Sequence, residues 1–202
     1  MDNMAYLNQI SADNRRSAQS KSFMLNPKVL IGLGIAAVVA LIIIVIGSLS
    51  GSGNKERDLV YRINLRSSNL IETISNYNEY IKSSRLKTMS SSLSAVLSNT
   101  VSDTNNIITE DYNDSGAPEK LTSEETDYIT EVNTDLETSR LNGRLDRSFV
   151  RQFSLEIALL MSLESECIAR TKSEGIETVL SSSYVNLESL HEEFENYTDA
   201  TN

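Results

Sequence analysis

The sequence predicts an all-α protein in which a single transmembrane helix is followed by an antiparallel bundle of four to five helices. Three observations lead to this prediction. Residues 29–49 form an apolar stretch without any charged residue. In the segment that follows, apolar residues recur at intervals of three and four, which places them on one face of a helix. The 202-residue chain also has only two prolines and no strand-like alternation of polar and apolar residues.

Composition and charge restrict the class of partner. The net charge of the chain is −10. Residues 1–28 have a net charge of +2, so the remaining residues have a net charge of −12. An acidic domain without a basic stripe argues against a nucleic-acid partner. The single cysteine, Cys167, excludes an intrachain disulfide and a thiolate metal cluster, and its apolar neighbours predict a small core residue.

The N-terminal part predicts a tail and an anchor. Residues 1–28 mix polar and charged residues without periodicity, which is typical of a disordered N-terminal tail. A helix over residues 29–49 would be roughly 31 Å long, enough to span a bilayer core. This apolar stretch is longer than that of a usual signal peptide and begins after 28 residues, so an uncleaved anchor is expected. Cleavage near Ser48 and Ser50 is the alternative.

Small residues within the anchor indicate a face for self-association. Gly32, Ala36 and Ala40 recur every four residues on one side of the helix. Small residues at this spacing let two membrane helices approach closely, which predicts a homodimer through this face. A Gly/Ser hinge over residues 47–53 then separates the anchor from the bundle.

The basic residues on either side of the anchor predict its orientation. Four Lys or Arg residues lie within 20 residues of each end, so their numbers balance. The net positive charge of the short tail favours a cytoplasmic N-terminus and an extracytoplasmic C-terminal domain. The expected localisation is therefore the cell membrane, with the lipid bilayer as one partner.

Residues 54–202 form the predicted helical-bundle domain, which begins with a helical hairpin. Asn54 is a candidate N-cap for a helix that reaches about Ile81, and Ser83-Ser84 marks a turn. So short a connection predicts two antiparallel helices. The first carries an apolar stripe of Val60, Ile63, Ser67, Leu70, Ile74, Tyr77 and Ile81, and the second one of Leu86, Met89, Leu93, Val96, Thr100 and Ile107.

The rest of the domain predicts one loop and three further helices. Residues 113–120 form the loop, and Thr122 with Glu125 matches a capping box at the start of a shorter helix that ends at Asn142-Gly143. The next helix is apolar on nearly every side over residues 153–163, which predicts the most buried position. The last helix starts after Gly175. The stripes of these two helices are Leu145, Phe149, Phe153, Ile157, Leu160 and Cys167, then Ile176, Leu180, Leu187, Leu190, Phe194 and Tyr197.

The only histidine, His191, provides the single pattern that resembles a metal site. Glu188 and His191 have the Glu-x-x-His spacing that carboxylate-bridged di-iron bundles use. Such sites need a second pair, and Glu156 is the only other carboxylate in an apolar setting. Glu156, Glu188 and His191 are thus the candidate metal ligands, but without a second histidine no metal and no cofactor are expected. His191 is instead expected to border the core with its ring edge in solvent.

No pattern in the chain indicates catalysis. The Gly-x-Ser-x-Gly nucleophile turn is absent, and no glycine-rich phosphate loop occurs. Three charge clusters are expected to be solvated faces, although the first lies near the anchor and is suited to anionic headgroups, and the second is suited to pairing with acidic helices. These clusters are Lys55, Arg57, Arg62 and Arg66; Arg140, Arg144, Arg147 and Arg151; and Glu188, Glu192, Glu193 and Glu195.

Two short strings resemble a bacterial family. Residues 145–151, Leu-Asp-Arg-Ser-Phe-Val-Arg, resemble the Phe-Asp-Arg-x-Tyr-Val that opens a long helix in the exported ferritin-like helical-bundle domains of unknown function. Residues 187–191, Leu-Glu-Ser-Leu-His, resemble the closing Leu-x-x-Leu-x-x-His of that family. The likeness covers about residues 57–197 and implies a ferritin-like fold. The histidines of the family near Ile157 and in the second helix are missing here, which argues against metal binding.

Three functions are compatible with these features. The leading hypothesis is a non-enzymatic, single-pass bacterial membrane protein that displays an acidic bundle to a protein partner or contributes to the cell envelope. The alternative is an extracytoplasmic ligand-binding or sensor bundle. A third hypothesis is a degenerate ferritin-like metal protein.

Overall fold

The computed structural model describes residues 55–112 and 116–198. The predicted tail (1–28), membrane helix (29–49), hinge (47–53) and association face (Gly32, Ala36 and Ala40) lie outside these ranges and stay predictions. The chain divides into two units, Met1–Val38 and Val39–Asn202, and all described residues belong to the second. Within the described ranges, no helix combines the length and apolar character needed to cross a bilayer.

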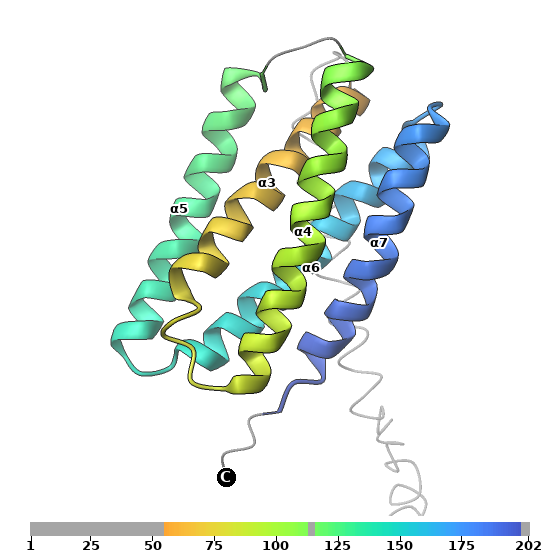
Figure 1. Cartoon of the computed structure of the whole chain (residues 1–202). Coiled ribbons are helices and arrows are strands. Elements are labelled where there is room, and N and C mark those ends of the chain that lie inside the picture. Colours follow the sequence, from red (N-terminus) through yellow and green to blue (C-terminus); the bar gives the residue numbers. More distant parts are fainter. Residues whose placement is uncertain (1–54, 113–115, 199–202) are drawn as a thin grey trace, which may run out of the picture. The chain divides into compact units, whose positions relative to one another are not determined.

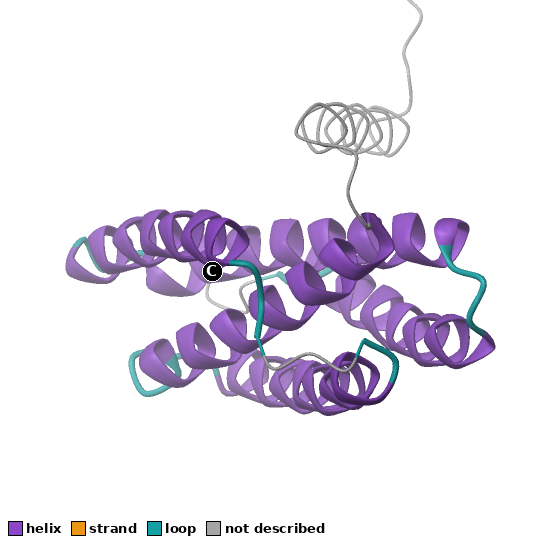
Figure 2. Cartoon of the chain, turned by 90° about the horizontal axis from the view of Figure 1, so that it is seen from above, coloured by secondary structure: helices purple, strands orange, loops and turns teal. Residues whose placement is uncertain are grey.

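The described residues form an all-α bundle, as the sequence predicts (Figures 1 and 2). Consecutive helices run in opposite directions (Figure 1). α3, α4, α7 and α6 form a closed ring in which each helix packs against the next, and α5 packs on the outside against α3 and α6. The five helices are α3 (Lys55–Tyr77), α4 (Ser84–Glu110), α5 (Glu119–Leu141), α6 (Leu145–Arg170) and α7 (Glu174–Glu195).

α5 serves as the crossover of this bundle. The chain leaves α4 at one end, returns along α5 to the other end, and starts α6 beside the α3–α4 connection (Figure 1). α6 therefore runs parallel to α4, and the two hairpins α3–α4 and α6–α7 lie side by side. This is a bundle with one crossover connection rather than a simple up-and-down bundle.

The core is divided between the two ends of the bundle. The larger cluster lies toward the α3–α4 connection and is centred on Phe149 and Phe153, whose stacked rings are 4.1 Å apart between centroids. The smaller cluster lies around the start of α3 and includes Val60, Leu180 and the buried thiol of Cys167. Burying a side chain of this size contributes roughly 1.5–3 kcal/mol, so these two clusters dominate the stability of the bundle.

Most predicted apolar stripes are buried. All six predicted stripe residues of α6 are at most 5% exposed. α6 packs against three other helices, but so does α3, so α6 shares the most buried position that the sequence predicts for it alone. The stripe of α4 is correct except at one point, where Leu97 is fully buried and Val96 only partly.

Three local predictions are wrong. The first helix ends at Tyr77 rather than near Ile81, although Ile81 is still buried in the connection. The helix after the loop is not shorter, since α5 and α3 both have 23 residues. The predicted capping box does not form, because α5 already begins at Glu119 and the hydroxyl of Thr122 donates to the carbonyl of Pro118. The carboxylate of Glu125 is buried and bound elsewhere.

Candidate functional site

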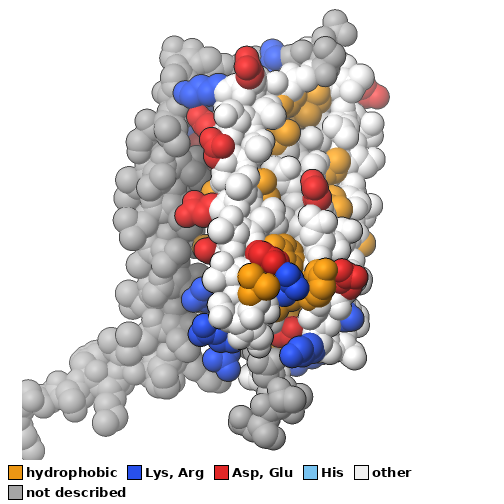
Figure 3. Space-filling model, turned by 90° about the vertical axis from the view of Figure 1, so that its left-hand side faces the viewer, with side chains coloured by type: hydrophobic (Ala, Val, Ile, Leu, Met, Phe, Trp, Pro, Cys, Tyr) orange, Lys and Arg blue, Asp and Glu red, His pale blue; other side chains and the backbone are white. Residues whose placement is uncertain are grey.

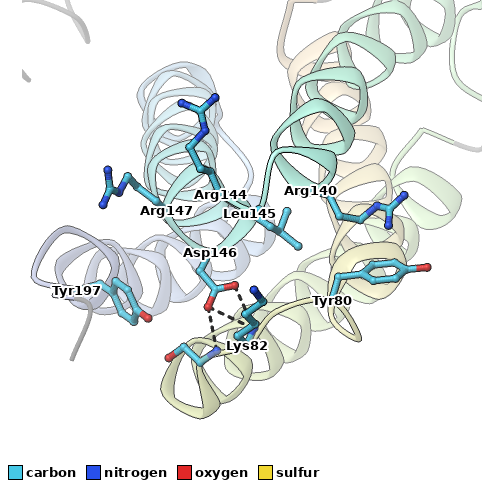
Figure 4. A pocket seen from close by; sticks show the side chains of 10 residues that line it. Tyr80, Lys82, Arg140, Arg144, Leu145, Asp146, Arg147 and Tyr197 are labelled. Carbon is cyan, nitrogen blue, oxygen red and sulfur yellow. Dashed lines mark hydrogen bonds between the residues drawn. The ribbon is translucent and has the colours of Figure 1, made fainter. Parts of the chain in front are cut away.

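A hollow of about 640 Å³ opens at the end of the bundle where the α3–α4 and α5–α6 connections meet. It is called the end hollow below (Figure 4). Its volume lies in the range of small-ligand pockets, roughly 300–1,000 Å³. The residues that line it are Tyr80, Lys82, Ser83, Arg140, Gly143, Arg144, Leu145, Asp146, Arg147 and Tyr197.

A tight turn between α5 and α6 shapes one wall of the end hollow. The amide of Gly143 donates to the carbonyl of Arg140 over 3.0 Å, and the amide of Arg144 donates to that of Ser139 over 2.9 Å. Gly143 has a φ of 67°, a left-handed conformation that glycine adopts without the cost of a Cβ. The turn lets α6 start directly beside the end of α5.

Asp146 joins the α3–α4 connection to α6. Its carboxylate accepts the backbone amide of Ser83 at 2.9 Å and that of Lys82 at 3.1 Å (Figure 4). Ser83 in turn caps α4, since its hydroxyl accepts the amide of Leu86. Among the described residues, Asp146 is the only carboxylate that lines the end hollow, and it is already engaged with these two backbone amides.

The basic residues around the end hollow differ in their partners. Arg140 forms two hydrogen bonds to Glu137, at 2.6 and 2.7 Å, and its guanidinium lies 4.6 Å from the centroid of the Tyr80 ring. Arg144, Arg147 and Lys82 are exposed, and no carboxylate in the described ranges lies within 4.0 Å of their charged groups. Several Lys and Arg side chains lie at the lower end of the face in Figure 3, with Asp and Glu side chains among and above them.

The start of α6 adds a further positive contribution. Arg144 occupies the N-cap position, and its side chain makes no capping hydrogen bond. The first amides of a helix have no partner within the helix, and the aligned peptide dipoles give this end a partial positive charge. The end hollow therefore combines a helix N-terminus with two flanking arginines.

A buried ion pair ties α3 to the crossover helix. The carboxylate of Glu125 accepts two hydrogen bonds from Arg66, at 2.8 and 3.1 Å, and one from Arg62, at 2.6 Å. Arg66 is 8% exposed and Glu125 is 1% exposed. Burial alone would lower the pKa of Arg66, but the adjacent charge of Glu125 raises it, so the guanidinium stays ionised.

The predicted metal candidate Glu156 ends a polar chain that starts at this ion pair. Arg66 lies 4.2 Å from the centroid of the Tyr128 ring, and the Tyr128 hydroxyl donates to Glu156 over 2.6 Å. Gln152 donates to the same oxygen over 2.7 Å, while Oε2 has no hydrogen-bond partner in the described ranges. Burial raises the pKa of Glu156, against the opposing effects of its hydrogen bond from Tyr128 and the positive charge of Arg66.

The three candidate metal ligands are not gathered into one site. Glu188 is exposed on α7, and Glu156 binds Tyr128 and Gln152. His191 lies 3.7 Å from the Glu195 carboxylate and 3.5 Å from the Ser154 hydroxyl, with 16% of its side chain exposed. Within the described ranges, no group of three His, Cys, Asp or Glu side chains is placed to hold a metal ion.

A third buried carboxyl, after those of Glu125 and Glu156, lies between α6, α7 and α4. Glu164 accepts from the Ser183 hydroxyl at 2.7 Å, and that hydroxyl is 2.7 Å from the hydroxyl of Thr100. Burial raises the pKa of Glu164 to about 8. Thr100 and Ser183 also line a smaller surface hollow of about 200 Å³, so this carboxyl lies directly behind the protein surface.

Cys167 has none of the features of a nucleophile. It is fully buried, and burial raises the pKa of its thiol to about 12, so the reactive thiolate is not populated near neutral pH.

Comparison of the chain with models of protein families, with curated proteins and with solved structures finds no match.

Proposed function

We propose that this protein is a single-pass membrane-anchored helical bundle that binds a partner or ligand at its end hollow and catalyses no reaction. The observation that carries the binding part is the end hollow itself, with Lys82, Arg144 and Arg147 around it. No carboxylate of residues 55–112 or 116–198 forms an ion pair with these three side chains. The anchor is supported by the uncharged apolar stretch of residues 29–49.

The described bundle supports this proposal over an enzymatic one. Its buried carboxyls, Glu125, Glu156 and Glu164, are hydrogen-bonded to side chains of neighbouring helices. The single histidine contacts Ser154 and Glu195 and is not among the residues that line the hollow. Binding, unlike catalysis, requires only a suitable shape and charge, and the end hollow has both.

A specific observation favours a second candidate, an extracytoplasmic ligand-binding or sensor bundle. The volume of about 640 Å³ suits a small ligand better than a flat protein surface would. For the fold, the crossover along α5 supports the resemblance to ferritin-like bundles, which also have one crossover connection.

Fractionation and protease shaving of intact cells test the anchor and its orientation. The full chain should stay in the membrane after an alkaline wash, and external protease should remove the bundle while leaving a short N-terminal fragment. A variant that lacks residues 29–49 is the control and should leave the membrane fraction. Release of the full chain by the alkaline wash would overturn the anchor, and full protection from protease would overturn the outside location.

A further inference from the structure

We propose that α5 is a detachable helix, which separates from the bundle and unfolds as one unit while the ring of α3, α4, α7 and α6 stays folded. Its release uncovers the seam between α3 and α6. This motion depends neither on what binds at the end hollow nor on the membrane anchor, so it can be tested apart from the proposed function.

The ring of four helices is closed without α5. α3 packs directly against α6, and α4 and α7 complete the circle, so each ring helix has two neighbours within the ring. α5 lies on the outside, against α3 and α6 (Figure 1). The ring therefore keeps all its own helix pairs when α5 leaves.

α5 buries few of its side chains. Four of its 23 residues are buried, whereas ten are buried in α3, which has the same length. Three of the four are apolar, Leu121, Val132 and Leu136, and the fourth is Glu125. Because burial of an apolar face is the main force that holds a helix in a bundle, α5 is held less firmly than α3.

The contacts that join α5 to the ring are largely polar. Glu125 of α5 binds Arg66 of α3, and the Tyr128 hydroxyl of α5 donates to Glu156 of α6 over 2.6 Å. When the two surfaces separate, all of these groups regain hydrogen bonds to water, so they add little net free energy to docking. Oε2 of Glu156 has no hydrogen-bond partner in the described ranges, and separation would let water reach it.

The exposed side of α5 weakens the helix itself. Its threonines recur every four residues, at Thr122, Thr126, Thr130, Thr134 and Thr138. Threonine has a low helix propensity. The first four hydroxyls also donate to the carbonyl four positions earlier, a hydrogen bond that slightly destabilises a helix. α5 has no side-chain cap at its start either, so it depends on the ring for its helical form.

Detachment would also move one wall of the end hollow. Arg140 lines the hollow from the last turn of α5, and its guanidinium lies 4.6 Å from the centroid of the Tyr80 ring (Figure 4). Release of α5 takes Arg140 away from Tyr80. The hollow is therefore complete only while α5 is docked.

Hydrogen exchange of the full chain in detergent, followed by mass spectrometry at increasing urea, tests the proposal on the natural sequence. Amides in the central turns of α5 should exchange at least about tenfold faster than those of α3 and α6. Their rates should also depend less on urea, because a partial opening exposes less surface than global unfolding. Equal rates and equal urea dependence in these helices would show that α5 opens only with the whole bundle, and would overturn the proposal.

A pair of thiols provides a second measurement. Val132→Cys places a thiol on the buried face of α5, and the natural Cys167 of α6 is the internal control. A thiol reagent should modify the introduced thiol at least about tenfold faster than Cys167, after correction for the rates of both in the urea-unfolded chain. Modification of both thiols at the same rate would contradict detachment.

A further substitution separates detachment from global unfolding. Ile176 is 1% exposed on α7, which packs against α4 and α6. Ile176→Val weakens the ring equally in the docked and the detached states. It should therefore speed the modification of Cys167 roughly three- to tenfold and leave that of the thiol introduced by Val132→Cys unchanged. An equal rise at both thiols would overturn the proposal.

Discussion

Buried charged residues determine much of how the helices of this bundle are joined. Arg66 of α3 donates hydrogen bonds to Glu125 of α5, and both side chains are almost wholly removed from solvent. Taking two charges out of water is costly, and their attraction offsets that cost only while both are present. Such a pair is therefore sensitive to the loss of one member.

Replacement of Glu125 tests this sensitivity. Glu125→Leu leaves Arg66 and Arg62 without their shared acceptor and should lower the free energy of unfolding by about 3–5 kcal/mol. Chemical denaturation monitored by circular dichroism measures the change. Glu124→Gln, which removes a more exposed partner of Arg62, is the control and should cost less than about 1 kcal/mol. Equal effects of the two variants would contradict the buried pair.

Because burial raises the pKa of Glu164, the stability of the protein is expected to depend on pH. Its pKa is about 8 in the folded protein and near the usual 4.5 in the unfolded chain, so between these values the unfolded chain binds fewer protons. Stability due to this group is fully present below pH 4.5, falls as the pH rises, and has lost roughly 3–5 kcal/mol by about pH 8. Glu164→Gln should therefore raise the melting temperature at pH 8 and flatten this part of the profile.

Thermal unfolding from pH 5 to pH 9 measures this effect. The control is Glu166→Gln on the same helix, where the carboxylate binds Arg170 at the surface. The melting temperature of that variant should fall with rising pH as much as that of the natural chain. A Glu164→Gln profile parallel to that of the natural chain would show that Glu164 does not titrate as described.

At the scale of the helices, the caps explain where the elements begin. Ser83 and Ser173 precede α4 and α7, and the hydroxyl of each accepts an amide three residues on, from Leu86 and Ile176. α5 has no side-chain cap, although its sequence contains Thr122 and Glu125 at capping-box spacing. The capping pattern is correct only where the residue is not already inside a helix.

Alanine substitutions distinguish the capped N-termini of α4 and α7 from the N-terminus of α5, which has no side-chain cap. Ser83→Ala and Ser173→Ala should each lower the free energy of unfolding by about 1 kcal/mol, because each leaves a helix amide without its acceptor. Thr122→Ala should change it by less than about 0.5 kcal/mol, since Thr122 is exposed and its hydroxyl donates within the helix. Urea denaturation of the three variants gives the comparison. A larger loss for Thr122→Ala than for Ser83→Ala would restore the capping box.

At the scale of the whole molecule, the five described helices share two core clusters. Among the described residues, these clusters draw on positions 59–197, and every described helix packs against at least two others. We therefore expect residues 55–198 to fold without the predicted anchor.

Removal of residues 1–53 tests this independence. The truncated chain should unfold cooperatively, with a melting temperature within a few degrees of that of the full chain, because no described core contact is lost. Differential scanning calorimetry of both chains provides the comparison. A truncated chain without a cooperative transition would show that the N-terminal part contributes to the fold.

The sequence by itself determined the all-α class, the position of each described helix to within a few residues, and most of the apolar residues of the core. These features can be predicted from the spacing of apolar residues, because residues three and four positions apart lie on the same face of a helix. Only the tertiary structure decided which charged residues form ion pairs and which residues line the end hollow. Arg62 and Arg66 belong to a basic cluster that the sequence suggests is solvated, yet they pair with Glu124 and Glu125 from a helix about 60 positions away.

The end hollow likewise joins Lys82, Arg144 and Tyr197 from three distant parts of the chain. The regular spacing of Arg140, Arg144 and Arg147 is visible in the sequence. Only the fold shows that, among the described residues, Arg140 has a carboxylate partner and Arg144 and Arg147 have none. The physical reason is that a helix face depends on residues close in sequence, whereas ion pairs and hollows depend on which helices become neighbours.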